Sequence, residues 1–290
     1  MSLSQIPWQI LVIIASLIRS LSLSLNKHQS HKASALQVQS IKYLSASLFI
    51  GSFWWLTSKS LPANWYIFFI FGLAVGVNVT IYTQAQRISL SQTSLIRPIG
   101  QLLGITLAGL ILQEWKLFTG DKGILLIFAL ILMPLFFWLF YEIESHYSKK
   151  WIKLAVTFLT ILAVFKVITK ILLNTTDNAV DLLVFQYLGA FTSTFIGVFI
   201  RKHKMYIDKK FTIKGLIQGV LAGFATLLFY TALKKTTVIQ TTLLSTPLVV
   251  LLATLSGLIG FKEIKNMTRK KWLGTGVAGI IMILVLAANR

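Results

Sequence analysis

Residues 91–114 read SQTSLIRPIGQLLGITLAGLILQE, and residues 241–263 read TTLLSTPLVVLLATLSGLIGFKE. Each stretch has a proline near its start, Pro98 or Pro247, then a run of mainly apolar and small residues, and then a glutamate, Glu114 or Glu263. Both pairs are 149 positions apart (247 minus 98, and 263 minus 114). A membrane-spanning helix needs roughly 20 mostly apolar residues, so the two stretches predict equivalent transmembrane helices in a duplicated chain.

Further matches at nearly the same spacing extend the duplication along the chain. They are Gly72 and Gly76 against Gly219 and Gly223, and Tyr82-Thr83 against Tyr230-Thr231. The repeat predicts two five-helix halves, residues 1–145 and 146–290, and the second half is inverted in the membrane because five is odd. The paired glycines predict close helix packing. Pro98 and Pro247 predict helix kinks with a gating role.

The composition indicates an all-α integral membrane protein. Hydrophobic residues make up 56% of the chain and charged residues 12%, about half the charged fraction of a soluble protein. The net charge of +20 does not indicate nucleic-acid binding, because most Lys and Arg residues form short clusters between apolar runs. The sequence therefore predicts a lipid-embedded chain in a membrane, with a bacterial inner membrane as the expected location.

Ten apolar runs are predicted to span the membrane as one helical bundle, because irregular backbone in lipid would leave polar groups unpaired. The runs are Ile6–Leu25, Ala33–Leu56, Asn64–Gln84, Ser91–Gln113, Gly123–Tyr141, Trp151–Leu173, Asp181–Ile200, Ile213–Leu233, Thr237–Gly260 and Trp272–Ala288.

The repeat unit resembles the EamA-type unit of the drug/metabolite transporter superfamily. The resemblance covers the whole chain and rests on the stretches Ser91…Pro98…Glu114…Gly123 and Thr241…Pro247…Glu263…Gly274. It implies a ten-helix transporter with inverted repeats and a central cavity lined by helices one, three, four and their repeat partners. Relatives carry many kinds of solute, so the resemblance does not indicate the substrate.

The resemblance and the charge distribution disagree on orientation. Members of the superfamily usually have both termini in the cytoplasm. The odd-numbered connections of this chain carry 17 Lys and Arg residues, whereas the even-numbered connections and the C-terminus carry seven. The positive-inside rule therefore predicts cytoplasmic odd connections, with both termini on the other side.

Basic residues inside the predicted spans are the main candidates for substrate binding, since a charge in the membrane is costly unless it meets water, a partner or a ligand. Arg19, Arg97 and Lys166 predict an electropositive cavity that binds a carboxylate or phosphate. The alternative is that these long side chains reach the lipid headgroups, which fits Lys42 and Lys170 well. No Asp or Glu lies clearly inside a predicted span, so a cationic-drug/proton antiporter is disfavoured.

Neutral polar residues in the spans are further candidates for lining the cavity, although each can equally serve as a hydrogen bond between helices. They are Asn78, Tyr82, Gln92, Gln101, Tyr230, Gln240 and Thr246.

Catalytic and metal-binding motifs are absent from the sequence. It has no Walker loop, no Gly-x-Ser-x-Gly, no His-Glu-x-x-His and no cysteine, so no enzymatic activity and no cofactor are expected. His28 and His31 alone make a poor metal site.

The sequence leaves three functions open. The first is a secondary transporter that moves a small organic metabolite, anionic by expectation, by alternating access, as a monomer or a homodimer. The second is a flippase for an anionic lipid-linked headgroup such as a polyprenyl phosphate. The third is a membrane scaffold with no transport cycle, whose interior would be dry.

Overall fold

The fold was obtained as a computed structural model. It describes residues 3–29, 33–57, 60–88, 90–140, 148–202, 208–261 and 268–289. Within these ranges, the side chains at positions 4, 23–29, 86–87, 90–98, 140 and 253–261 lie outside the description.

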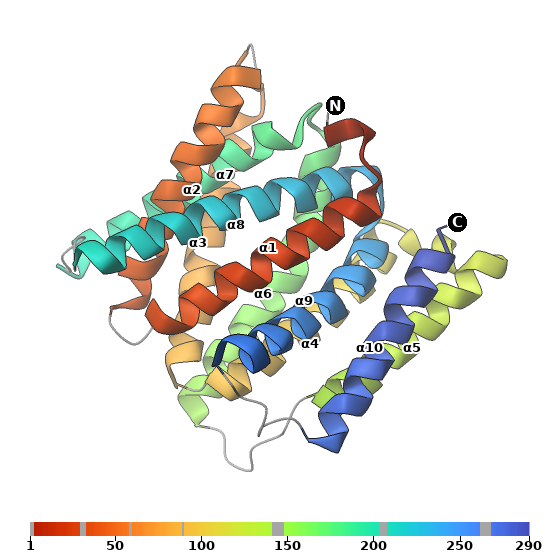
Figure 1. The fold of residues 1–290 in the computed structure, drawn as a ribbon. Helices are drawn as coiled ribbons and strands as arrows, with labels where there is room; N and C mark the ends of the chain where they lie inside the picture. Colours follow the sequence, from red (N-terminus) through yellow and green to blue (C-terminus); the bar gives the residue numbers. More distant parts are fainter. Residues whose placement is uncertain are drawn as a thin grey trace.

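The described part of the chain folds into ten α-helices and two short 3-10 helices (Figure 1). The first half contains η1 (Leu3–Gln5), α1 (Trp8–Gln29), α2 (Ala35–Thr57), α3 (Trp65–Ile88), α4 (Leu90–Ile111), η2 (Glu114–Phe118) and α5 (Asp121–Phe140). The second half contains α6 (Lys149–Asn174), α7 (Ala179–Ile200), α8 (Lys209–Lys235), α9 (Val238–Phe261) and α10 (Arg269–Ala287). The prediction of an all-α membrane protein is confirmed, with one helix for each predicted span.

Six of these helices are long and apolar enough to cross a membrane when only the described residues are considered: α3, α5, α6, α7, α8 and α10. Their starts follow ordinary capping chemistry. The Asp208 carboxylate accepts a hydrogen bond from the Phe211 N–H at 2.6 Å, and the hydroxyls of Ser148 and Thr268 cap α6 and α10 in the same way. Such caps satisfy N–H groups that have no partner within the helix.

Helices from the two halves of the chain pack against each other throughout the bundle. α1 packs on α8 and α9, α2 packs on α7 and α8, and α6 packs on α3 and α4. Figure 1 shows α1 beside α8, and it shows α5 and α10 as an adjacent pair at one edge. The helices of the first half therefore bury much of their surface against helices of the second half.

The tightest helix contact joins α3 to α7 through two glycines. A Cβ at Gly72 would lie 2.8 Å from the carbonyl carbon of Gln186, and a Cβ at Gly189 would lie 2.8 Å from the backbone nitrogen of Leu73. Real Cβ atoms are essentially never closer than 3.0 Å to such neighbours, so the two backbones approach as only glycine allows. The remaining glycines of the repeat also face neighbouring helices: Gly76 meets Ala190 and Ser193 of α7, and Gly219 and Gly223 meet α2.

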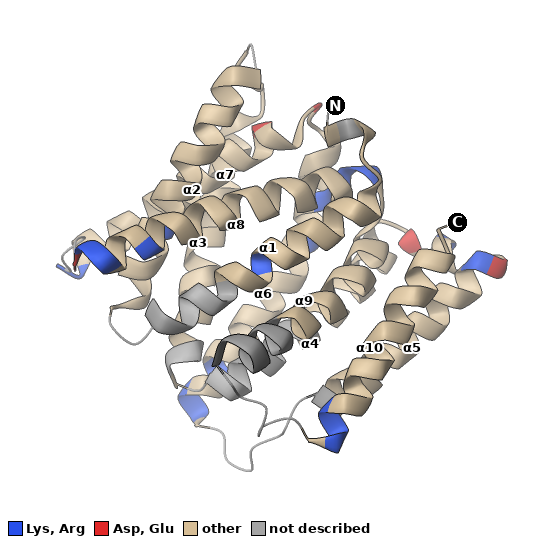
Figure 2. Cartoon of the chain, viewed as in Figure 1, with Lys and Arg blue, Asp and Glu red and all other residues tan. Residues whose placement is uncertain are grey.

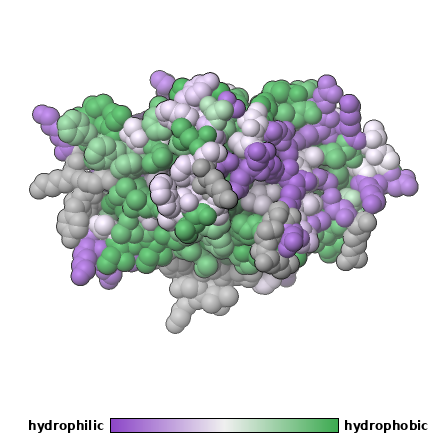
Figure 3. Space-filling view, turned by 90° about the horizontal axis from the view of Figure 1, so that it is seen from above, coloured by the Kyte–Doolittle hydropathy of each residue, from purple (hydrophilic) through white to green (hydrophobic). Residues whose placement is uncertain are grey.

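Charged residues gather at the ends of the helices, which suits a chain surrounded by lipid. Figure 2 shows Lys and Arg mainly near helix ends, with Asp and Glu few in number. Hydrophobic side chains cover the left and middle of the face in Figure 3, and hydrophilic residues gather toward its right. Exposed apolar side chains such as Ile131, Phe199 and Ile283 are compatible with contact to hydrocarbon.

Candidate functional site

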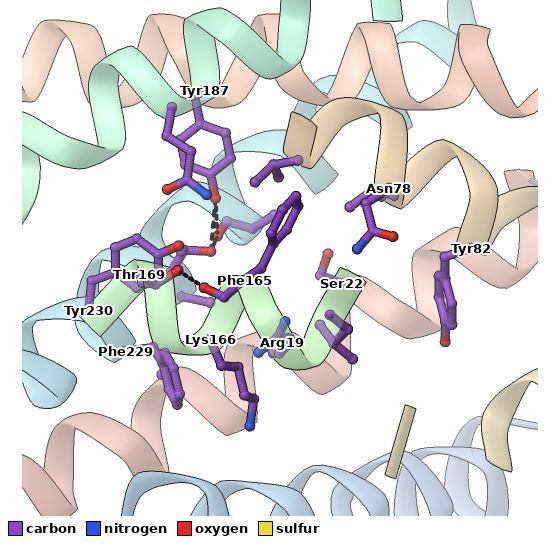
Figure 4. A pocket seen from close by; sticks show the side chains of 18 of the residues that line it. Arg19, Ser22, Asn78, Tyr82, Phe165, Lys166, Thr169, Tyr187, Phe229 and Tyr230 are labelled. Atoms are coloured by element: carbon purple, nitrogen blue, oxygen red, sulfur yellow. Dashed lines mark hydrogen bonds between the residues drawn. The ribbon is translucent and has the colours of Figure 1, made fainter. Parts of the chain in front are cut away.

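A cavity of about 270 Å³ lies within the bundle, and its lining combines polar and charged side chains with a larger apolar surface (Figure 4). Eight helices contribute to its lining: α1, α2, α3, α4, α6, α7, α8 and α9. Its size is slightly below the range typical of sites for drug-sized ligands, so it suits one small organic molecule. The resemblance implied a lining from helices one, three, four, six, eight and nine, and the structure adds α2 and α7.

Three basic residues line the cavity: Arg19 of α1, Lys42 of α2 and Lys166 of α6. None of the described lining residues is an Asp or Glu. The three basic side chains give the described lining a net positive charge. The sequence analysis favoured a Lys42 side chain that reaches the lipid headgroups. In the structure Lys42 lines the cavity, and its ammonium lies 5.8 Å from the centre of the Tyr43 ring.

Lys166 also connects three helices. Its stem lies against α4, where a Cβ at Gly104 would be 2.7 Å from the Lys166 Cδ. Its ammonium donates a 2.7 Å hydrogen bond to Thr242 Oγ1 of α9, and Thr242 is buried. The Lys166 charge thus sits at the meeting point of α4, α6 and α9 while lining the cavity.

Tyrosines form a second group in the lining. Tyr187 of α7 donates a hydrogen bond to Thr226 Oγ1 of α8 at 2.8 Å. Tyr230 of α8 lines the same cavity as Gln186 of α7, Thr169 of α6 and Arg19 of α1. Arg19 is thereby placed among polar side chains from several helices.

Amide side chains form the third group. Gln39 of α2 donates from Nε2 to Thr83 Oγ1 of α3 at 3.0 Å, and Gln218 of α8 donates from Nε2 to the Ser22 carbonyl of α1 at 3.3 Å. Asn78, Gln101 and Gln186 complete the set. Aromatic rings form apolar walls beside these amides: Phe71, Phe158, Phe165 and Phe229.

Several residues predicted for the site lie together in this cavity, and others do not. Arg19, Lys166, Tyr82, Gln101 and Tyr230 all belong to the lining. Gln240 is not among the described lining residues, since it donates to Asn289 Oδ1 at 2.7 Å near the start of α9, and buried Thr246 is not among them either.

The remaining predicted residues fall partly outside the description. Gln92, Arg97 and Pro98 belong to α4, but their side chains lie outside the described part. Glu263 also lies outside the described residues. Pro247 lies inside α9.

The sequence interpretation missed the contribution of α2 and α7. Gln39, Gln186 and Gln218 line the cavity. Each lies within an apolar run, and a single uncharged polar residue in such a run does not by itself indicate a binding site. The paired dipeptides Tyr43-Leu44 and Tyr187-Leu188 were the available signal, because both tyrosines line the cavity and their rings lie 5.9 Å apart.

Lysines at one end of the bundle bind backbone carbonyls at helix ends. Lys170 of α6 donates to the carbonyls of Leu233 and Thr236 at 2.7 and 2.6 Å. Lys234 donates to the Thr176 carbonyl, and Lys235 donates to the Leu3 carbonyl. The last carbonyls of a helix lack partners within that helix, so these cations stabilise the ends of α6 and α8 and also join α8 to η1.

Glu114 has the complementary role at the same end of the molecule. Its two carboxylate oxygens accept hydrogen bonds from the N–H groups of Val238 and Ile239, each at 3.0 Å. These are the first residues of α9, where the helix dipole favours a negative charge. No group of three potential metal ligands occurs among the described residues.

The fold and the cavity define a polytopic α-helical membrane protein with an internal cavity whose described lining includes three basic residues. A family model described as "Sugar transport protein" matches residues 9–289, nearly the whole chain. The chain belongs to this family, which is a family of membrane transporters of small molecules.

Similarity to individual proteins adds evidence on the fold alone. The chain resembles a crystal structure described only as that of a protein, with a TM-score of 0.75, 11% identity and coverage of 98% of each chain. No curated protein sequence matches the chain. Family membership indicates transport rather than catalysis, and the substrate must be inferred from the cavity.

Proposed function

We propose that this chain is a secondary transporter that moves a small anionic organic solute across a bacterial inner membrane, with the central cavity as its substrate site. The observation that carries the proposal is the set of Arg19, Lys42 and Lys166 around a cavity whose described lining has no acidic residue. Cations that line a partly enclosed cavity favour a solute that carries negative charge. A carboxylate or phosphate on the solute supplies that charge, and the family name suggests a sugar-like solute.

The cavity also argues against a scaffold. A scaffold needs a dry, well-packed interior, whereas this interior contains a space lined by amides, hydroxyls and cations. Polar groups in the interior of a membrane protein are expensive and mark pathways for polar solutes. Eight helices converge on the cavity, so a change in their packing alters access to it.

Alternating access is supported by the way the helices pair. In a five-helix repeat, α1 is equivalent to α6, α2 to α7, α3 to α8, and α4 to α9. Exchanging each helix for its equivalent turns the α1–α8 contact into α6–α3, the α1–α9 contact into α6–α4, and the α2–α8 contact into α7–α3. This exchange is expected of two inverted five-helix halves, an architecture that places the substrate between the halves near the middle of the membrane. The EamA-like relationship of the repeat is part of this proposal.

The test combines ligand-dependent thermal stability of the purified protein with transport in proteoliposomes. A ligand that binds only the folded state raises the unfolding temperature. We expect gluconate or glucose 6-phosphate to stabilise the native protein more than glucose does. We also expect the stabilising compound to exchange across the membrane in a counterflow assay.

Two variants test the basic site, with a control on the same helix. Arg19→Gln and Lys166→Gln should each weaken binding of the anion by tenfold or more, since a charge-assisted contact contributes about 1.5–3 kcal/mol. Lys153→Gln removes the same charge from an exposed position of α6 and should bind normally. Equal anion binding in all three variants would overturn the basic site, and binding without counterflow would overturn transport.

A further inference from the structure

The two sides of the cavity differ in their exposure. On one side, Thr169 of α6 and both Tyr230 and Leu233 of α8 line the cavity and are 6%, 8% and 3% exposed. On the other side, Lys42 near the start of α2 and Tyr82 near the end of α3 line it and are half-buried. The more buried side faces the ends of α6 and α8. These helices end where both termini lie (Figure 1), which we call the terminal end.

The α8–α9 turn covers this buried side. The turn consists of Thr236 and Thr237, between the end of α8 and the start of α9. Leu233 before the turn and Val238 after it belong to one buried hydrophobic cluster with Leu173 of α6. Because α8 and α9 both line the cavity, a turn that stays in place keeps this side of the cavity shut.

Lys170 of α6 holds the turn from the side of the cavity. Its ammonium donates to the Leu233 carbonyl at 2.7 Å and to the Thr236 carbonyl at 2.6 Å. The preceding residue, Thr169, lines the cavity, as Leu233 does. The end of α6 is therefore tied to the end of α8 beside the buried wall of the cavity, by charge-assisted bonds that are stronger than neutral ones.

Glu114 of η2 holds the other side of the turn. Its carboxylate oxygens accept from the N–H groups of Val238 and Ile239, each at 3.0 Å, and Glu114 is buried. The two charges suit the two helix ends that meet at the turn, since a helix C-terminus favours a cation such as Lys170 and an N-terminus favours an anion. Glu114 comes from the first half of the chain and Lys170 from the second, so both halves hold the turn.

We infer that the α8–α9 turn is the gate of the cavity at the terminal end, and that Lys170 and Glu114 hold this gate closed in the structure. The inference rests on the proposed function, under which the cavity is reached from each side of the membrane in turn. It adds the part of the protein that closes one side. When both contacts break, the turn moves away from α6 and η2 and exposes the cavity wall at Thr169 and Leu233.

These contacts can break without leaving groups that water cannot satisfy. The carbonyls that Lys170 binds lie at the end of α8, and the N–H groups that Glu114 binds are the first of α9. Such groups have no partner within their own helix, and water can replace the side chain that binds them. Lys234, which donates to the Thr176 carbonyl beyond α6, makes a third contact of the same kind.

The alternative is that these contacts only fix the helix ends. Their loss would then lower the unfolding temperature without giving access to the cavity from the terminal end. Access is therefore the measurement that separates a gate from a structural contact, because stability falls in either case.

The experiment measures access with a single cysteine at Val75, a half-buried lining residue of α3. The native sequence has no cysteine, so Val75→Cys supplies the only thiol. A small, membrane-impermeant thiosulfonate is applied to sealed membrane vesicles of each orientation. Lys122→Cys at the start of α5 and Lys210→Cys at the start of α8 identify the vesicles that expose the terminal end.

A closed gate predicts that Val75→Cys reacts mainly from the end opposite the termini. Lys170→Met, which removes the charge, and Glu114→Gln should each raise the rate from the terminal end about tenfold. That factor is the population shift expected when one charge-assisted hydrogen bond is lost. Equal rates from both ends in the native background, or unchanged terminal-end rates in both variants, would overturn the gate.

Lys235→Met is the matched control for the lost bond. It removes another lysine–carbonyl contact at the same end, but Lys235 joins α8 to the Leu3 carbonyl and not to α6. The terminal-end rate should stay unchanged in this variant. A gain equal to that of Lys170→Met would contradict a specific role for Lys170.

Ala129→Cys is the control for unfolding. Ala129 of α5 is fully buried and is not among the described residues that line the cavity. Its cysteine should stay unreactive in every variant. A reaction of Ala129→Cys as fast as that of Val75→Cys would assign the gain to unfolding and would overturn the gate.

The labelling needs no solute, so its outcome is separate from that of the transport assay. A gain in terminal-end labelling without counterflow of any solute would support the gate and overturn transport. Counterflow with equal labelling from both ends in every variant would support transport and overturn the gate.

Discussion

Lys166 on α6 donates a 2.7 Å hydrogen bond to Thr242 on α9, and this bond joins two of the helices that line the candidate site. Thr242 is almost fully buried, and the Lys166 stem passes over Gly104 of α4. The same ammonium lines the cavity. A group that attracts the Lys166 charge therefore acts directly on the α6–α9 contact.

Removal of the Thr242 hydroxyl tests this bond. Thr242→Val keeps the shape of the side chain but removes the acceptor, so we expect the free energy of unfolding to fall by about 1–3 kcal/mol. Thr241→Val is the matched control, because Thr241 is equally buried and bonds only to carbonyls near its own helix start. It should cost less. A double-mutant cycle with Lys166→Gln should give a coupling energy above about 0.5 kcal/mol, and zero coupling would contradict the contact.

Glu114 should stabilise the start of α9. Glu114→Ala removes the acceptor for the Val238 and Ile239 N–H groups, and we expect a loss of about 2–3 kcal/mol in thermal or denaturant unfolding. Glu114→Gln keeps one acceptor and should lose about half as much. Asp121→Asn is the control, since Asp121 also begins a helix but is exposed. An unchanged stability of Glu114→Ala would show that the cap is unimportant.

The α3–α7 contact should tolerate no side chain at its two glycines. Gly72→Ala and Gly189→Ala each place a methyl group against the opposite backbone, and we expect each to destabilise the protein by about 3 kcal/mol. Gly276→Ala on α10 is the control, because nothing lies within 4 Å of the position, and alanine favours helix there. Equal unfolding temperatures for Gly72→Ala and Gly276→Ala would contradict this packing.

The helices could be predicted from the sequence because their signal is local. Every predicted span overlaps one helix, and all ends agree within four residues. The apolar runs are long and the basic clusters separate them clearly. The largest differences, of four residues each, are at the end of α1, the end of α3 and the start of α8.

The cavity could be predicted only in part because its lining depends on which helices meet. Charge inside a span marked Arg19 and Lys166, and the repeat marked Tyr82 and Tyr230. Nothing local distinguishes Gln218, which lines the cavity, from Gln240, which bonds to Asn289 at a helix start. That distinction requires the packing of α8 against α1 and α2.

The orientation of the chain in the membrane can be tested by labelling single introduced cysteines, because the sequence itself contains no cysteine. Lys170, Lys234 and Lys235 account for three of the seven cations at the end that carries both termini, and they bind helix-end carbonyls. Few basic residues therefore remain at that end to interact with anionic lipids, which strengthens the charge bias toward the opposite end.

We expect a cysteine at Lys122, exposed at the start of α5, to react with a membrane-impermeant maleimide in intact cells. A cysteine at Lys210, exposed at the start of α8, should react only after permeabilisation. The reverse pattern would place both termini in the cytoplasm, as the resemblance to EamA-type transporters implies, and would show that the structural lysines do not explain the charge distribution.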